Sequence, residues 1–237
     1  MRLAQTVSHE LGLATMPPPS SVVFVVDDDI SVRESLELLI QNEGWQPKTF
    51  ESAQEFLDYR RALIPSCLVL DLSLPGLNGL ELQKRVSVER AEIPIIFITG
   101  HGDIPKTVEA MKGGAVEFLT KPFNDEVLLT AIRRALERSR LALAHKIELQ
   151  ELRDRYASLT PREGQVMALV VSGLLNKQVG GELGIIEKTV KAHRGQVMQK
   201  MKANSVADLV KMAEKLHLGA LHSPVHEEGA DREATRK

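Results

Sequence analysis

The chain has 237 residues, a formal net charge of −2 and a hydrophobic content of 43%, values typical of a globular protein with one large domain or two smaller ones. No stretch approaches the ~20 apolar residues that are needed to span a bilayer, which argues against a helical membrane protein. Cys67 is the only cysteine, and the first residues do not resemble a secretory signal. We therefore expect a cytoplasmic protein with no internal disulfide and no membrane partner.

Charge and composition divide the chain into segments. Counting Lys and Arg against Asp and Glu, residues 21–137 carry roughly −7 and residues 157–215 roughly +4. This asymmetry predicts an acidic module joined to a module that meets a polyanion. Residues 1–20, which include three consecutive prolines, and the polar residues 219–237 are predicted to be disordered.

Residues 21–137 alternate short apolar runs with helical patterns, and each pair is a strand followed by a helix. The expected strands are residues 22–26, 48–50, 67–70, 94–98 and 116–119. The expected helices include residues 30–43, 79–88 and 103–111. Five such units predict an α/β fold with a doubly wound, five-stranded parallel sheet. In this class, ligands bind beyond the carboxyl ends of the strands.

Polar side chains stand at these strand ends. The first strand runs into Asp27, Asp28 and Asp29. The third strand leads to Asp71, the fourth to Thr99 and the fifth to Lys121. Carboxylates this close repel one another unless a cation lies among them, and hard oxygen ligands suit Mg²⁺. For Asp29 the alternative is a helix N-cap.

Phosphoryl chemistry fits these residue types. Asp71 is the best candidate nucleophile, because a carboxylate can attack a phosphoryl group and this one precedes an accessible Pro-Gly loop. Mg²⁺ would be held by Asp28, Asp71 and a backbone carbonyl near Ser73, and by Asp27 through water. Lys121 and Thr99 would bind the phosphoryl oxygens.

Four motifs then resemble the receiver domain of two-component response regulators, and one of them is most similar to the FixJ-like branch. They read Val-Asp-Asp-Asp, Leu-Asp-Leu-Ser-Leu-Pro-Gly-Leu-Asn-Gly, Ile-Thr-Gly-His-Gly-Asp-Ile-Pro and Lys-Pro-Phe. The resemblance implies that a histidine kinase phosphorylates Asp71 and that Thr99 and Phe118 move inward as a switch. It also implies a cis peptide before Pro122, and a role for Ser73 and His101 in the lifetime of the acyl phosphate. A core role for Phe118 and a solvated loop position for His101 remain alternatives.

A long segment without Gly or Pro follows the receiver-like part. We expect one helix to continue out of it, with a break near residues 141–145, and to form a helical linker over residues 138–156. Its apolar spacing fits an exposed amphipathic helix or a short coiled coil, and a plain tether is the remaining alternative.

Residues 157–218 are predicted to form an all-α module of four helices. Thr160, Pro161 and Glu163 have the spacing of a capping box at a helix start. Asn176 is expected to cap a second helix, and Ser205 a fourth. The helices at residues 176–183 and 187–201, joined by a short glycine-containing turn, have helix-turn-helix form.

The third of these helices carries the basic side chains that suit DNA: Lys188, Lys191, His193 and Arg194. Three motifs in this module, Leu-Thr-Pro-Arg-Glu, Gly-Leu-Leu-Asn-Lys and Thr-Val-Lys-Ala-His-Arg, resemble the LuxR-type DNA-binding domain. The resemblance implies dimerisation through the last helix. It also implies base contacts at Lys191, Ala192 and Gly195, and phosphate contacts at Lys177, Thr189 and Arg194.

Two departures from that pattern predict a marginally stable DNA-binding module. Ile186 stands where a capping Ser or Thr is usual, which costs about 1 kcal/mol. Glycines inside the expected helices each cost ~1 kcal/mol against Ala where they are exposed. These glycines are Gly164, Gly180, Gly181 and Gly195.

The resulting interpretation is a phosphorylation-switched transcription regulator that is not an enzyme beyond slowly losing its own phosphoryl group. Its expected partners are a histidine kinase, double-stranded DNA and, on phosphorylation, a second copy of the chain through the receiver's fourth helix, fifth strand and fifth helix. RNA polymerase is a further candidate partner. The alternatives are an aspartyl-phosphate hydrolase of the dehalogenase type and a phosphorylation-independent DNA-binding regulator with an inert pocket.

Overall fold

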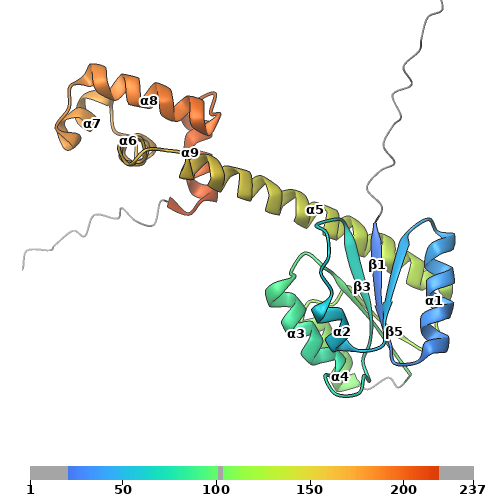
Figure 1. Ribbon diagram of the computed structural model, residues 1–237. Coiled ribbons are helices and arrows are strands. Elements are labelled where there is room, and N and C mark those ends of the chain that lie inside the picture. The colour runs from blue at the N-terminus through green and yellow to red at the C-terminus, as the bar shows by residue number, and fades with distance from the viewer. Residues whose placement is uncertain (1–20, 101–103, 219–237) are drawn as a thin grey trace, which may run out of the picture. The chain divides into compact units, whose positions relative to one another are not determined.

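The computed structural model describes residues 21–100 and 104–218, and the chain divides into two compact units, Met1–Ala144 and His145–Lys237 (Figure 1). The predicted disorder of residues 1–20 and 219–237 and the predicted role of His101 lie outside the described residues. The domain boundaries drawn from the sequence stay predictions.

The first unit is built on a five-stranded sheet in which every neighbouring pair of strands is parallel, with the order β2-β1-β3-β4-β5. The strands are β1 (Val22–Val26), β2 (Gln46–Phe50), β3 (Ser66–Asp71), β4 (Ile95–Thr99) and β5 (Glu117–Thr120). The helices are α1 (Ile30–Asn42), α2 (Ala53–Asp58), α3 (Gly79–Glu89), α4 (Ile104–Lys112) and α5 (Asp125–Ala157). The predicted doubly wound α/β fold is therefore confirmed.

Helices cover both faces of the sheet, with α1 and α5 on one side and α2, α3 and α4 on the other (Figure 1). Successive strand residues enter opposite cores: Phe24 and Leu68 pack in one, and Val25 and Val69 in the other. Burial on both faces explains why β1, β3 and β4 are continuous apolar runs in the sequence.

Several element bounds differ from the sequence prediction. β3 includes Asp71, because the pairing with β4 continues to Asp71 opposite Ile98. β2 begins at Gln46, two residues before the predicted start, since this edge strand alternates exposed and half-buried residues and lacks an apolar run. The predicted break near residues 141–145 is wrong, because α5 is one continuous helix.

Two polar side chains hold α5 at its start and along the receiver-like unit. Asn124 Oδ1 accepts a hydrogen bond from the Glu126 N–H at 2.8 Å, as expected for a cap. Further along, the buried Ser139 hydroxyl accepts from Ser66 N–H at 3.1 Å and donates to the Glu92 carbonyl at 2.8 Å. This bridge fixes α5 against the amino-terminal end of β3.

The described part of the second unit contains four further helices: α6 (Pro161–Val171), α7 (Asn176–Leu183), α8 (Glu187–Met201) and α9 (Val206–Lys215). Their buried core is Leu152, Val166, Met167, Val170, Val179, Val190, Val197, Met201, Leu209 and Ala213. The predicted helix-turn-helix is the pair α7 and α8, joined through Gly184 in the left-handed conformation at φ 65°. Within the described chain, none of the helices is sufficiently long and apolar to span a membrane.

The helix caps of this unit agree with the sequence at three of four positions. The predicted capping box is present at Thr160 and Glu163, and Ser205 Oγ accepts from Asp208 N–H at 3.1 Å. Ile186 precedes α8, where its apolar side chain cannot accept a capping bond. The prediction for Asn176 is wrong: Leu175 is the N-cap residue, and its N–H donates to Gln178 Oε1 at 2.8 Å.

Candidate functional site

The first unit brings Asp27, Asp71 and Lys121 together at the carboxyl edge of the sheet. Lys121 Nζ lies 2.6 Å from Asp27 Oδ2 and 3.0 Å from Asp71 Oδ1. The strand order explains this meeting, because β1 and β3 are neighbours and the long Lys121 side chain extends from the end of β5. Three of the residues that the sequence assigned to one pocket are thus in contact.

Thr99 is the last residue of β4, the strand between β3 and β5, and it is fully buried. Its carbonyl accepts a hydrogen bond from Lys121 N–H at 2.7 Å, so the backbone of the fifth strand end is tied to the fourth. The peptide bond between Lys121 and Pro122 is cis, as the resemblance implied. Phe118 is half-buried and its ring centroid lies 6.2 Å from that of Phe97, which agrees with the core role left open for it.

Burial controls the ionisation of this pocket. Burial raises the pKa of Asp27, although hydrogen bonds from Lys121 and from the Asp29 N–H lower it. Burial opposes the charge on Lys121 as well, but its hydrogen bonds to Asp27 and Asp71 outweigh that effect and raise the Lys121 pKa. Burial has the larger effect at Asp27, whose side chain is 1% exposed, whereas the hydrogen bonds prevail at Lys121, whose side chain is 24% exposed. One ammonium therefore neutralises two buried carboxylates incompletely.

The three aspartates of the turn after β1 have different surroundings and different hydrogen bonds. Asp27 Oδ1 accepts from the Asp29 N–H at 3.0 Å, while Asp29 Oδ1 accepts from the Ser31 N–H at 2.8 Å and caps α1. The capping alternative for Asp29 is therefore the one the structure shows. Asp28, between Asp27 and Asp29 in the chain, is exposed.

The loop after β3 presents Asp71 and depends on a glycine that sequence reasoning did not single out. Ser73 N–H donates to Asp71 Oδ2 at 2.7 Å, which orients the carboxylate. At Gly79, the first residue of α3, an added Cβ would lie 2.6 Å from the Asp71 carbonyl oxygen and 3.0 Å from Leu72 Cα. The signal in the sequence is a glycine directly after the Asn78 cap, where a helix would accept almost any residue.

The donor set at this edge has the chemistry of an Mg²⁺ site, since Asp27, Asp28 and Asp71 offer only hard oxygen atoms. In the part of the chain that the structure describes, however, no three His, Cys, Asp or Glu side chains are already grouped to hold a metal ion. Lys121 occupies the space between Asp27 and Asp71 instead.

In the second unit, the predicted DNA-contacting residues lie on α8 and at the start of α7. Val190 and Val197 anchor α8 in the core, and this leaves one side of the helix outward. The exposed residues among the predicted contacts are Lys177, Lys188, Lys191 and Ala192, and the half-buried ones are Thr189, His193 and Arg194. The predicted contact residues of α8 thus include both outward and partly covered side chains.

Acidic and polar partners engage several of these cations. Lys191 Nζ lies 3.0 Å from Glu187 Oε1, one turn earlier on α8. Arg194 Nη1 donates to Asn176 Oδ1 at 3.1 Å, which ties α8 to the first residue of α7. Lys200 has a structural role, because its Nζ lies 2.6 Å from Glu163 Oε2. The sequence placed these cations on the helix that became α8 but could not identify these partners.

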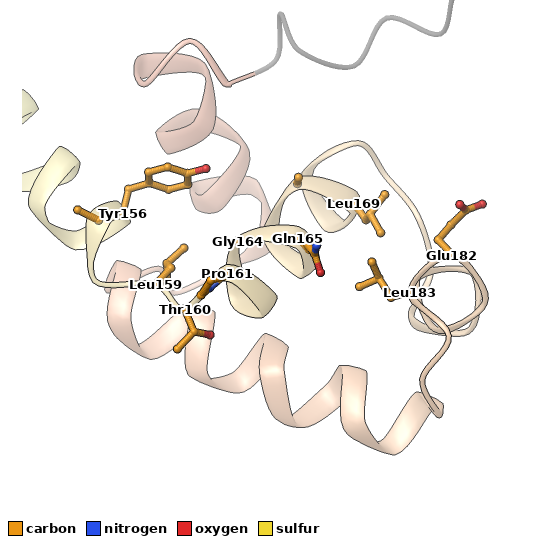
Figure 2. A pocket seen from close by; sticks show the side chains of 11 residues that line it. Tyr156, Leu159, Thr160, Pro161, Gly164, Gln165, Leu169, Glu182 and Leu183 are labelled. Atoms are coloured by element: carbon orange, nitrogen blue, oxygen red, sulfur yellow. The ribbon is translucent and has the colours of Figure 1, made fainter.

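The helical unit also has a hollow of about 600 Å³ bordered by the end of α5, by α6 and by α7 (Figure 2). Its lining is mainly apolar and includes Tyr156, Leu159, Leu169 and Leu183. None of the residues predicted to contact DNA lines it. It is therefore distinct from the predicted DNA-binding surface.

Two family models match the chain. The response regulator receiver domain matches residues 23–133, and the model of bacterial regulatory proteins of the luxR family matches residues 157–213. The first match contains the Asp27, Asp71 and Lys121 pocket, and the second contains α6, α7 and α8.

Full-length proteins are similar across both units. Nodulation protein W of Bradyrhizobium diazoefficiens is 51% identical over 90% of this chain and 93% of its own. Response regulator protein TmoT of Ectopseudomonas mendocina is 45% identical over 87% of this chain and 94% of its own. Transcriptional regulatory protein FixJ of B. diazoefficiens is 43% identical over 81% of this chain and 93% of its own.

Two solved structures show the same combination of parts. Response regulator StyR is 48% identical, with a TM-score of 0.74 over 83% of this chain and 99% of that chain. Full-length FixJ from B. japonicum is 42% identical, with a TM-score of 0.50 over 83% of this chain and 97% of that chain. These matches favour a response regulator over the hydrolase alternative. The chain belongs to the two-component response regulators and combines a receiver domain with a LuxR-type DNA-binding domain.

Proposed function

We propose that Asp71 accepts a phosphoryl group from a histidine kinase, and that this modification controls binding of the second unit to double-stranded DNA. The observation that carries the proposal is the contact of Lys121 Nζ with both Asp71 and Asp27. A carboxylate at a strand end, oriented by the Ser73 N–H and facing a fixed cation, is suited to attack phosphorus.

The chain's own residues have separate roles in this step. Asp28, Asp71 and the Ser73 backbone carbonyl would hold Mg²⁺, with Asp27 binding it through water, and the ion would neutralise charge on the phosphoryl oxygens. Lys121 remains protonated at neutral pH, because its pKa is raised, and can bind one phosphoryl oxygen. The Thr99 hydroxyl donates to another. Slow loss of the phosphoryl group to water would return Asp71 to its starting form.

An apolar stripe on α4 supports dimerisation of the phosphorylated receiver. Ile104, Val108 and Met111 are 77%, 45% and 43% exposed, and their spacing places them on one face of the helix. α4 packs beside β5 in the same unit. Since a contiguous exposed apolar surface marks an interaction site, we place the homodimer contact on α4, β5 and the start of α5.

Dimerisation would join two DNA-binding units and so select paired half-sites. In each unit Lys191 and Ala192 would meet base edges, and His193 would lie beside them. Lys177, Lys188, Thr189 and Arg194 would lie near phosphates. We infer that the protein acts in the cytoplasm, where it meets the chromosome, and RNA polymerase is its candidate partner there.

Phosphorylation of the full-length chain tests this function directly. With acetyl phosphate and Mg²⁺, intact-mass spectrometry should show the gain of one phosphoryl group, and Asp71→Asn should not gain it. In vitro selection from random DNA should then enrich paired half-sites with the phosphorylated protein more than with Asp71→Asn. A protein that selects the same DNA with equal affinity in both forms would support the alternative of an inert receiver pocket.

A further inference from the structure

Arg33 is a half-buried residue near the start of α1 that none of the proposed steps uses. Its Nη1 atom donates to the carbonyl oxygen of Asp27 at 2.7 Å and to that of Asp28 at 3.0 Å. One guanidinium nitrogen thus holds two consecutive peptide groups of the acidic turn. The contact is to the backbone, so it leaves the carboxylates of this turn available for other partners.

The other hydrogen bonds of the turn indicate which carboxylate the Arg33 contacts affect. Asp27 accepts from Asp29 N–H through Oδ1 and from Lys121 through Oδ2, and Asp29 caps α1. The exposed Asp28 carboxylate is therefore the acid of this turn that is most accessible to a cation. Its direction follows from the backbone at residues 27–28, which is the part that Arg33 holds.

We propose that Arg33 is a positioning residue for the divalent cation, an inference that rests on the proposed function. By fixing the two peptide groups, Arg33 holds Asp28 ready for the ion, so less conformational freedom is lost when the ion binds. The positive charge of the guanidinium also repels the divalent cation, and this repulsion opposes binding of the ion. The two effects have opposite signs, so variants that keep or remove the charge separate them.

Mn²⁺ is a suitable probe, because the electron paramagnetic resonance signal of the free ion reports its dissociation constant and Mg²⁺ can be measured by competition. The full-length chain, Arg33→Lys and Arg33→Met are compared. Arg33→Lys keeps the charge but loses the guanidinium geometry, and Arg33→Met removes both. We expect both variants to bind Mn²⁺ about tenfold more weakly, the size typical of lost outer-shell support.

Arg85→Met is the matched control, since Arg85 is an exposed arginine of the same unit on α3. It should bind Mn²⁺ as the wild type does. Phosphorylation by acetyl phosphate gives a second readout: the Mg²⁺ concentration for half-maximal rate should rise about tenfold in both Arg33 variants, while the rate at saturating Mg²⁺ stays within about twofold. A general loosening of the unit would instead lower the saturated rate.

Three outcomes would overturn the inference. The first is an unchanged Mn²⁺ affinity in both Arg33 variants, and the second is tighter binding by Arg33→Met, which would make repulsion the dominant effect. The third is a loss of rate at saturating Mg²⁺ with the half-maximal concentration unchanged. Failure of the wild type to bind Mn²⁺ would overturn the proposed function itself, so the two failures are distinguishable.

Discussion

Gly79→Ala should destabilise the receiver unit, although alanine is the better helix former. A Cβ at Gly79 would lie 2.6 Å from the Asp71 carbonyl oxygen, against about 3.3 Å for an ordinary carbon–oxygen contact, so the chain must move by about 0.7 Å. Overpacking of this kind costs about 1–3 kcal/mol. Alanine offsets about 0.4–1 kcal/mol of this cost because it restricts the unfolded chain. The free energy of unfolding should therefore fall by about 1–2 kcal/mol.

The only tryptophan of the chain makes this measurement specific to the receiver unit. Trp45 packs against the core on the α1 side of the sheet, so its fluorescence during urea unfolding reports this unit alone. The midpoint should fall, and phosphorylation of Asp71 should slow because the obstructing atom belongs to that residue. A midpoint equal to or above that of the wild type would refute the reasoning from close approach.

Four further results are expected. Gly164→Ala in α6 should stabilise the helical unit by up to about 1 kcal/mol in circular dichroism melts, because, beyond its chain neighbours and the backbone of its own helix, the added Cβ would meet no described atom within 4 Å. Ile186→Ser should stabilise the same unit by about 1 kcal/mol by supplying the missing cap, and no change in its melting would contradict the capping argument. Asp27→Asn should raise the urea midpoint of the receiver at pH 7. Because the pKa of Asp27 is raised in the folded protein, its contribution to stability is present below the ordinary aspartate pKa of 3.8 and is lost as pH rises through the folded pKa, so this gain should vanish below pH 3.8. Glu187→Gln should strengthen binding to unselected DNA at low salt, because it frees Lys191 and removes a negative charge from α8, the helix that we propose contacts DNA; fluorescence anisotropy at several salt concentrations measures it.

The sequence predicts best those contacts that follow directly from the order of strands and helices along the chain. In a parallel sheet all carboxyl ends lie at one edge, so the sequence alone predicts that strand-end residues such as Asp27, Asp71 and Lys121 lie together. The capping boxes are local in the same sense, since Thr160 and Glu163 meet across a single helical turn.

Contacts that depend on packing could not be predicted. Gly180 was expected to weaken its helix, but a Cβ there would lie 2.7 Å from the Ile185 carbonyl oxygen, so the glycine is needed where α7 turns toward α8. In the sequence Arg33 resembles any charged residue on a helix surface, but in the fold its Nη1 atom donates to two carbonyls of the acidic turn. In each case the partner is a backbone atom whose position follows from the folded turn.

Lys121 offers a way for a phosphoryl group on Asp71 to affect β5, the edge strand of the receiver sheet. Its Nζ is shared between Asp27 and Asp71, so a phosphoryl group on Asp71, which adds roughly −1.5 to −2 charges, would draw the ammonium toward itself and away from Asp27. The Lys121 N–H is bonded to the Thr99 carbonyl at 2.7 Å, so this displacement would act on the ends of β4 and β5 together. Because α4 packs beside β5, the apolar stripe proposed for dimerisation lies next to the strand that we expect to respond. A response that depends on this sharing requires both carboxylates, and we therefore infer that Asp27 contributes to the switch as well as to cation binding.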